Sequence, residues 1–340
     1  MLTKSRRLLS LFFGLAVVLS AVAVAQAEPW SEKLGYPAGK KVLILHADDI
    51  GMCYEANLAA KAMLTTKSQI PGVMQIQSAA LMVPCPWYNE MADWYKENPD
   101  YDIGLHLAMT SEWKWYRWGP VADREKVKGL IDNEGYLFRK VESVVLSAKP
   151  TEIEAEIRAQ IEKALSKGTR PSHIDTHMGT LYARPDYTAV YLKLAEEYRI
   201  PAMAIEPTEK VMAKFKKQGY PVSEKGNEIL RNYKLPKLDD FYGAPDGKTY
   251  ADKKANFQAL VRSLDPGITE IIFHPSVETE CLKAITGSWQ QRAWEMQMFG
   301  DPEMQTFFER EGILFTNWKE MMKRWEPKFG DKLPKPKDAK

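Results

Sequence analysis

The chain has 340 residues, 45% hydrophobic and 27% charged, and its 47 basic side chains almost balance 45 acidic ones. This composition is typical of a globular protein and excludes a disordered chain. The near-zero net charge gives no reason to expect nucleic acid or an anionic membrane as a partner.

Residues 1–27 have the features of a signal peptide. Three basic residues come first, an apolar run follows from Leu8 to Val24, and Ala25-Gln26-Ala27 supplies the small-x-small pattern of a cleavage site. An uncleaved membrane anchor is the alternative, but the run is only marginally long enough to span a bilayer. Removal of this segment leaves 313 residues with 44 basic and 45 acidic side chains. We therefore expect an exported protein, periplasmic or secreted, with no membrane association after cleavage.

The first element of the mature chain is a buried strand that begins at Val42 and runs into Asp48-Asp49-Ile50-Gly51. A strand that ends with two carboxylates and a glycine leads into a turn at the carboxyl edge of a sheet, where α/β folds bind ligands. Two adjacent carboxylates repel each other unless a cation or water relieves them. The pair predicts a divalent-metal hydrolase site, and the alternative is an ordinary turn with two solvated aspartates.

The remainder of the chain alternates between predicted strands and helices. Strands are expected at 75–83, 102–107, 171–177, 202–206, 241–243, 270–274 and 313–317, and helices at 54–65, 87–96, 151–167 (with a capping box that starts at Thr151), 187–198 and 250–264. A long connection covers 110–149, an irregular Lys-rich insertion covers 208–239, and residues 326–340 are expected to be a disordered tail. About seven strands predict a single α/β domain over residues 28–325, either a parallel barrel or an open sheet.

Three cysteines, Cys53, Cys85 and Cys281, lie far apart in the sequence. An odd number in an exported chain allows at most one internal disulfide. We expect mostly buried free thiols.

The chain has only five histidines, and all of them lie on predicted strands: His46, His106, His173, His177 and His274. Four of the five are at or near the carboxyl ends of those strands. A single strand histidine is usually structural, but five confined in this way, beside an Asp pair on the same edge, indicate a site. Two histidines and one carboxylate directed at one point form a three-ligand metal centre with open positions for water.

Spacing alone leaves two assignments open. In an extended strand His173 and His177 share a face but lie roughly 13 Å apart, too far to bind one ion. One would ligate and the other would support, and His177, nearer the strand end and followed by Gly179, is the better candidate. Asp48 and Asp49 point to opposite faces if the strand continues, so the turn must redirect one of them.

Several segments together resemble the YdjC-like carbohydrate deacetylases, relatives of the NodB-type polysaccharide deacetylases. The matching segments occur in the family's order over about residues 41–318: His46-Ala47-Asp48-Asp49-Ile50-Gly51, Gly104-Leu105-His106-Leu107, Pro171-Ser172-His173-Ile174-Asp175-Thr176-His177, Phe241-Tyr242-Gly243 and His274-Pro275. The resemblance implies an irregular (β/α) barrel of about seven strands. It also implies hydrolysis of an N-acetyl group from an amino sugar or short oligosaccharide, with a divalent ion, Mg²⁺ or Zn²⁺, as cofactor.

The resemblance also implies roles for individual residues. The metal ligands would be Asp49, His106 and His177, and Asp48 would be the base that activates a metal-bound water. His274 would protonate the leaving amine; a strand end bonded to backbone is the structural alternative for His274-Pro275. The supporting residues would be His46, His173 and Asp175. The chain departs from the family pattern at His46, where Asn is usual, at Ile50, where Phe is usual, and in the insertion at 208–239.

An aromatic group follows the third predicted strand on the side where the site should open: Trp113, Trp115, Tyr116 and Trp118. Stacking on sugar rings is the functional interpretation, and a core or lid cluster is the structural one. If the segment is extended, Trp113 and Trp115 share a face. We expect these two and Tyr242 to contact substrate.

Two rival functions remain at this point. One keeps the metal but changes the reaction to another amide hydrolysis or to sugar-phosphate hydrolysis, and the lack of a glycine-rich phosphate loop disfavours the phosphate version. The other is an exported glycan-binding protein without catalysis, which would not need the paired aspartates.

Overall fold

A computed structural model describes residues 28–67, 74–333 and 335, so the predicted leader at 1–27 lies outside the described residues. Within these described ranges, seven parallel strands form one sheet: β1 Lys41–Ile50, β2 Ser78–Leu81, β3 Ile103–Leu107, β4 Ile174–Thr176, β5 Asp240–Gly243, β6 Gly267–Phe273 and β7 Leu314–Phe315. The strand order is β4-β3-β2-β1-β6-β5. The fold is therefore α/β, as predicted.

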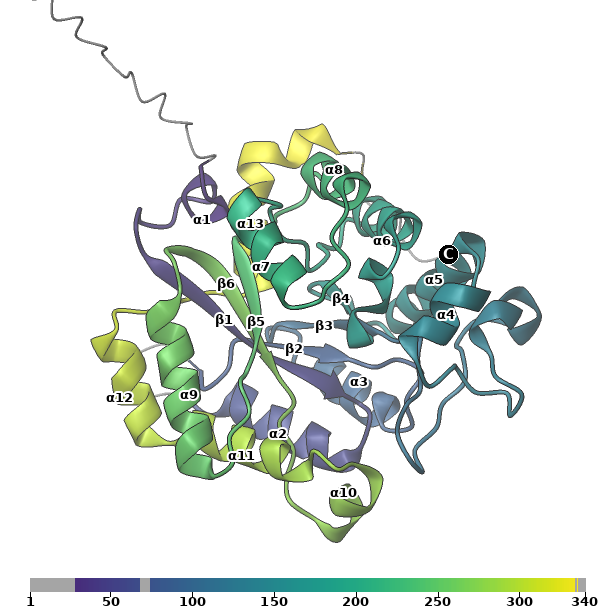
Figure 1. Ribbon diagram of the computed structural model, residues 1–340, viewed down its shortest axis with the longest axis horizontal. Helices are drawn as coiled ribbons and strands as arrows, with labels where there is room; N and C mark the ends of the chain where they lie inside the picture. Colours follow the sequence, from purple (N-terminus) through teal and green to yellow (C-terminus); the bar gives the residue numbers. More distant parts are fainter. Residues whose placement is uncertain (1–27, 68–73, 334, 336–340) are drawn as a thin grey trace, which may run out of the picture.

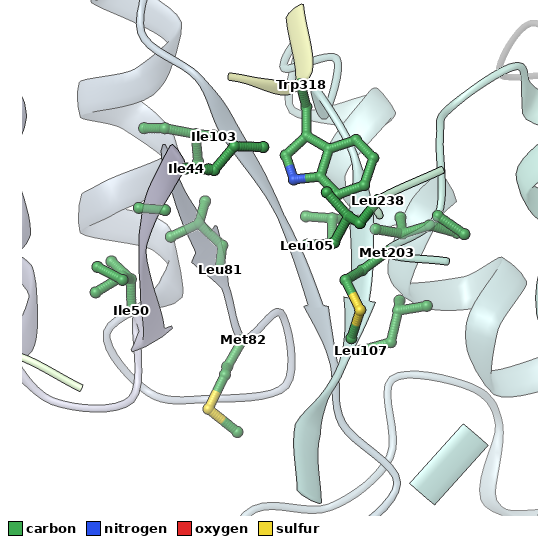
Figure 2. Packing of buried hydrophobic residues seen from close by; sticks show 14 of the residues in the cluster. Ile44, Ile50, Leu81, Met82, Ile103, Leu105, Leu107, Met203, Leu238 and Trp318 are labelled. Carbon is green, nitrogen blue, oxygen red and sulfur yellow. The ribbon is translucent and has the colours of Figure 1, made fainter. Parts of the chain in front are cut away.

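The strand β1 is the centre of the sheet. It pairs with β6 from Lys41 to Ala47, with β2 through its carboxyl half, and with β7 near its start. Its apolar residues are buried because neighbouring strands flank it and helices cover the sheet. Figure 1 shows α2 (Tyr54–Thr65), α9 (Tyr250–Ser263) and α11 (Trp289–Gly300) on one side of the sheet, and α6 (Pro185–Tyr198), α7 (Glu209–Lys217) and α8 (Glu224–Asn232) on the other. Figure 2 shows the packing of Ile44, Leu81 and Leu105 from three adjacent strands. Since all strands are parallel, their carboxyl ends lie on one edge.

Helices connect the strands and extend the chain beyond them. They are α1 Trp30–Lys33, α2 Tyr54–Thr65, α3 Tyr88–Glu97, α4 Val141–Ser147, α5 Pro150–Ser166, α6 Pro185–Tyr198, α7 Glu209–Lys217, α8 Glu224–Asn232, α9 Tyr250–Ser263, α10 Glu280–Ile285, α11 Trp289–Gly300, α12 Pro302–Arg310 and α13 Trp318–Phe329. Short 3₁₀ turns occur at Arg124–Lys126, Lys128–Leu130, His177–Tyr182 and Gly330–Lys332. Within the described ranges, none of these helices has the length and apolarity that a bilayer crossing requires.

Several predicted elements need correction. No strand forms at 202–206, although this segment makes single parallel bridges to β4 (Ile174 to Ala202) and to the residues before β5 (Ile205 to Leu238). The insertion at 208–239 contains α7 and α8 and is not irregular throughout. The predicted tail starts too early, because α13 continues to Phe329 and a 3₁₀ turn follows it. Residues 334 and 336–340 lie outside the described part of the chain.

The start of α5 also differs from the prediction. Pro150 is already helical and Lys149 is the residue before the helix, so Thr151 is not the cap. The Glu152 carboxylate accepts a hydrogen bond from the Lys149 backbone N–H at 2.7 Å, which is the half of a capping box that the acidic residue supplies.

All three cysteines are free thiols. Cys53 and Cys85 are buried, as expected, and Cys281 is exposed. Burial raises the pKa of Cys53 to about 12, so this thiol is inert at neutral pH.

Candidate metal centre and active site

The end of β1 turns both aspartates toward the same space. Asp49 has a positive φ of 61° and Gly51 one of 86°, and the pairing of β1 with β2 is irregular between Ala47 and Ile50. The side chain of Asn57 holds this turn by accepting a hydrogen bond from the Gly51 N–H at 2.7 Å. The left-handed conformation of a non-glycine residue is costly and is found mainly at functional sites. The redirection that the sequence requires therefore occurs at Asp49.

Three buried donor atoms from three strand ends converge beside this turn. Asp49 Oδ1 lies 3.3 Å from His177 Nδ1 and 3.6 Å from His106 Nε2, and the two histidine nitrogens are 3.2 Å apart. Ligands of a tetrahedral ion at about 2.0–2.1 Å are separated by about 3.3 Å, so this triangle fits one ion. Asp49 Oδ1 is also buried without a hydrogen-bond partner, as expected for an oxygen reserved for a cation. The group can hold a metal ion.

The other nitrogen of each histidine is held by a carboxylate. His106 Nδ1 donates to Asp175 Oδ1 at 2.6 Å, and His177 Nε2 donates to Glu112 at 2.9 Å. A carboxylate can only accept, so each of these nitrogens carries a proton, and the opposite nitrogen is the one that faces Asp49 and can bind an ion once it is deprotonated. Metal-binding histidines are typically fixed in this way by an outer hydrogen bond.

The geometry separates His177 from His173. Strand β4 ends at Thr176, and His177 begins a turn in which Met178 and Gly179 both have positive φ. The two histidines therefore do not lie along one extended strand. His173 lies deeper, with its ring stacked on Trp318 at 5.4 Å between centroids and its Nδ1 2.9 Å from Ser172 Oγ.

Burial and neighbouring charges strongly shift the pKa values of the side chains in this centre. Burial would raise the pKa of Asp49, but Arg292, 2.8 Å away, and the adjacent histidines hold it well below its usual range. Burial opposes protonation of His177, yet Glu112 and Asp49 outweigh it and raise its pKa to about 10. The carboxylates therefore attract a positive charge to the position between the donors.

Asp48 lies beside His106, with its Oδ1 3.8 Å from His106 Nδ1. Its Oδ1 is 3.1 Å from His46 Nε2, and its Oδ2 is 3.9 Å from His274 Nε2. The side chain of His274 is 37% exposed, whereas Asp48 is buried. His274 follows β6 directly, and its backbone N–H donates to Glu295 at 2.8 Å. A carboxylate and a partly exposed imidazole thus face each other beside the donor group.

A cleft of about 370 Å³ adjoins these residues. It is lined by Glu112, Trp113, Lys114, Ile285, Thr286, Gly287, Ser288 and Arg292. Trp113 is buried against the Arg292 guanidinium, 4.6 Å from its ring centre, while Trp115 is 70% exposed, so the two do not share an environment. Trp118 is buried, as the core alternative predicts, and Tyr242 contacts Lys214 and is not among the lining residues.

Sequence reasoning missed Glu112, Arg292 and Glu270. Arg292 lies on α11, 243 residues from its partner Asp49, and no local pattern joins the two. Glu270 lies within the predicted strand of residues 270–274, where a fully buried acid is a detectable oddity. Glu112 sits just before the aromatic group, and its acceptor role was not evident from its position.

With this geometry in view, comparison with known proteins identifies the family. The family described as YdjC-like protein matches residues 42–310. The chain belongs to the YdjC-like family.

Relatives of this YdjC-like protein match it over most of their length. It is 29% identical over 275 residues to a protein from Thermus thermophilus named carbohydrate deacetylase, covering 80% of this chain and 91% of the relative. A carbohydrate deacetylase from Brevibacillus brevis is 28% identical over 284 residues, covering 82% and 99%. A solved structure from Enterococcus faecalis V583, named for cellobiose-phosphate cleavage, superposes with a TM-score of 0.67 at 23% identity over 84% of this chain and all of that one. At that identity the likeness shows the fold alone.

Proposed function

We propose that this protein is a metal-dependent carbohydrate N-deacetylase that removes acetyl groups from N-acetylated amino sugars or oligosaccharides. The observation that carries the proposal is the triangle of Asp49, His106 and His177 donor atoms with Asp48 next to it. The names of the relatives support the same substrate class. Asp49, His106 and His177 would hold the ion, for which the two nitrogen donors suit Zn²⁺ while Mg²⁺ is the alternative.

The chain's own residues supply the proton transfers of this reaction. When bound, the ion polarises the amide carbonyl and makes water more acidic. Asp48 accepts a proton from the attacking water, whose oxygen forms the new bond to the carbonyl carbon. His274 donates a proton to the amide nitrogen, so that the C–N bond breaks and the sugar leaves as an amine with acetate as the second product. Arg292 keeps Asp49 ionised and oriented throughout.

The substrate would enter through the cleft beside Trp113. We assign Trp113 to the wall of the acetyl pocket, because it packs on Arg292 at the donor group. Trp115, which is largely exposed, would stack on a sugar ring farther out. Tyr242 would contact sugar only if Lys214 leaves its ring.

Two wider proposals go with this function. The bridges made by residues 202–206 to β4 and to the segment before β5 support an irregular barrel that closes through this segment. The leader pattern at residues 1–27 supports export to the periplasm or medium, where the substrates would be extracytoplasmic glycans.

The decisive experiment is an acetate assay with purified protein, N-acetylated chitooligosaccharides, and Zn²⁺ or Mg²⁺. We expect acetate release by the wild type and at least a ~100-fold loss in Asp48→Ala, with metal content retained. Tight sugar binding without acetate under either metal would replace the proposal with a glycan-binding protein. Hydrolysis confined to other amides would replace it with a different amidohydrolase.

A further inference from the structure

A second polar network lies beneath the donor triangle, in the interior of the sheet. Its centre is His46, which is fully buried. The Nε2 atom of this ring lies 3.1 Å from Asp48 Oδ1 and 3.2 Å from Asp175 Oδ2. Asp175 in turn accepts the Nδ1 proton of His106 through its other oxygen. A chain of close contacts thus runs from Asp48 through His46 and Asp175 to His106.

The hydrogen bonds around the Nδ1 atom of His46 show that this nitrogen carries a proton. The Ser78 hydroxyl donates to Asp102 Oδ1 at 2.6 Å, so its only proton is used there. His46 Nδ1, 3.0 Å from the same hydroxyl oxygen, must then be the donor to it. A neutral His46 ring would therefore direct an Nε2 lone pair at two carboxylate oxygens. Such an arrangement is repulsive, so a cation is required between these atoms.

A proton meets this requirement better than a metal ion. The two separations from His46 Nε2 are ion-pair distances of 3.1 and 3.2 Å, and neither contact has the geometry of a hydrogen bond. A metal ion held by His46, His173 and Asp175 is the alternative, since one donor atom of each lies within 4.8 Å of the others. The edge from His173 Nε2 to Asp175 Oδ2 is 4.0 Å, longer than the edges of 3.2 to 3.6 Å in the triangle of Asp49, His106 and His177. Burial opposes charge on His46, yet Glu270, Asp175 and Asp48 outweigh it and raise the pKa of His46 well above the usual range.

The groups that face His46 come from four strands and the residue before one of them: Asp48 on β1, Ser78 on β2, Asp175 on β4, His173 just before β4, and Glu270 on β6 at 3.8 Å. Glu270 contributes only when it is ionised, because burial raises its own pKa to about 8. Asp48 and Asp175 make the two shortest carboxylate contacts with the ring.

We propose that His46 is a permanently charged positioning residue that joins the base Asp48 to Asp175, and through Asp175 orients His106. This inference rests on the proposed function for the role of Asp48. The imidazolium engages Asp48 Oδ1 and leaves Oδ2 toward His274 and the open side. It also faces the Asp175 oxygen that accepts no hydrogen bond from His106. Asp48 and the carboxylate that orients His106 therefore share one cation.

The test compares two substitutions of His46 with a matched core control. In His46→Gln the amide N–H₂ can reach both carboxylates without carrying charge, whereas His46→Leu keeps the volume and removes both contacts. We expect kcat to fall ~10–100-fold in His46→Leu with little change in KM, and less in His46→Gln. His173→Gln is the comparison, because it alters an equally buried imidazole whose nearest carboxylates are Asp102 at 3.5 Å and Asp175 at 4.0 Å, and not Asp48. A loss of kcat in His173→Gln as large as in His46→Leu, or no difference between Gln and Leu at 46, would overturn the proposal.

Two readouts do not depend on deacetylation. Nitrogen-15 NMR of the metal-loaded protein should show His46 with protons on both ring nitrogens at pH 8, and a neutral ring would refute the charge. Metal titration should give one equivalent per chain, with about 10-fold weaker affinity in His46→Leu because Asp175 loses its partner. A second equivalent that disappears in His46→Leu would place a metal where we place a proton. If the wild type releases no acetate, the proposed function fails, while these two measurements still decide the state of His46.

Discussion

Glu270 illustrates how burial sets the charge of a single side chain. It lies on β6 with no exposed surface, accepts a hydrogen bond from the Trp318 indole N–H at 2.8 Å, and has one carboxyl oxygen without a partner. Burial raises its pKa from 4.5 to about 8; His46 opposes this shift, and Asp175 and Asp48 act in the same direction as burial. The folded protein therefore holds a neutral acid at a position where the unfolded chain would have an ionised one.

The sign of the resulting pH dependence follows from linkage. Because the pKa of the folded state is the higher one, the folded state binds the extra proton, and this contribution to stability is complete below pH 4.5 and is lost as the pH rises toward about 8. The Gln side chain in Glu270→Gln cannot ionise. The melting temperature of this variant should therefore rise relative to that of the wild type as the pH increases across this window. Thermal melts of both proteins from pH 5 to 9 check this expectation. A difference in melting temperature that stays constant with pH would show that Glu270 is ionised in the folded protein.

Some of the individual site residues could be predicted from the sequence and others could not. Asp48, Asp49, His106 and His177 were predictable, because parallel strands bring their carboxyl ends to one edge and each of these residues lies at such an end. Arg292 was not, because it reaches Asp49 from a helix late in the chain. The orientation of Trp113 was also beyond prediction, because its segment is not extended and the ring turns inward onto Arg292.

Among the elements, β3 depends on a glycine that leaves room for a neighbouring ring. A Cβ at Gly104 would lie 2.5 Å from the His173 imidazole. That ring cannot retreat, because Trp318 stacks on it at 5.4 Å. The approach of β3 to β4 thus requires glycine for space, independent of backbone conformation.

Gly104→Ala should therefore destabilise the protein by about 1–3 kcal/mol, the typical cost of overpacking a core. Chemical denaturation measures the change in the free energy of unfolding. Gly243→Ala, at the end of β5, is the matched control, because a Cβ there meets nothing within 4 Å. If both substitutions cost the same, the close approach at Gly104 is relieved by movement and carries no constraint.

The predicted elements differ from the observed ones where a local pattern was weak. Helices α7 and α8 were missed because their exposed faces are rich in Lys and Glu, although Thr208 and Ser223 cap them in the usual way. The segment at 202–206 was predicted as a strand from its composition, but it forms only one bridge to each neighbour. Ladder formation depends on how neighbouring backbones align, which composition does not specify.

At the scale of the whole molecule, the interior of the sheet carries an excess of negative charge. Asp48, Asp49, Asp102 and Asp175 are all buried, and among the described residues Arg292 is the one guanidinium paired with any of them. Buried charges are stable only when paired or bound to metal, so a metal ion should be part of the folded protein's stability. Without it, protons on the histidines must supply the missing positive charge.

Metal binding should accordingly displace protons. With no metal bound, His177 has a pKa of about 10 because Glu112 and Asp49 outweigh the effect of burial, and the pKa of His106 is raised by Asp175 and Asp48 in the same way. At pH 7 a Zn²⁺ ion must remove at least the proton that His177 holds on Nδ1, since a ligand nitrogen needs its lone pair. Zinc affinity should therefore rise with pH between about 6 and 9.

Calorimetric titration of Zn²⁺ into EDTA-treated, dialysed protein checks this in two buffers of different ionisation enthalpy. The difference in observed heat should correspond to release of about one proton or more per ion at pH 7. The same zinc addition should raise the melting temperature, because an ion at 100 times its dissociation constant adds about 2.7 kcal/mol to the free energy of unfolding. Asp49→Asn is the control, since it removes the carboxylate from the triangle and should abolish both signals. Zinc binding to the wild type with no proton release would mean that the ion enters somewhere other than between Asp49, His106 and His177.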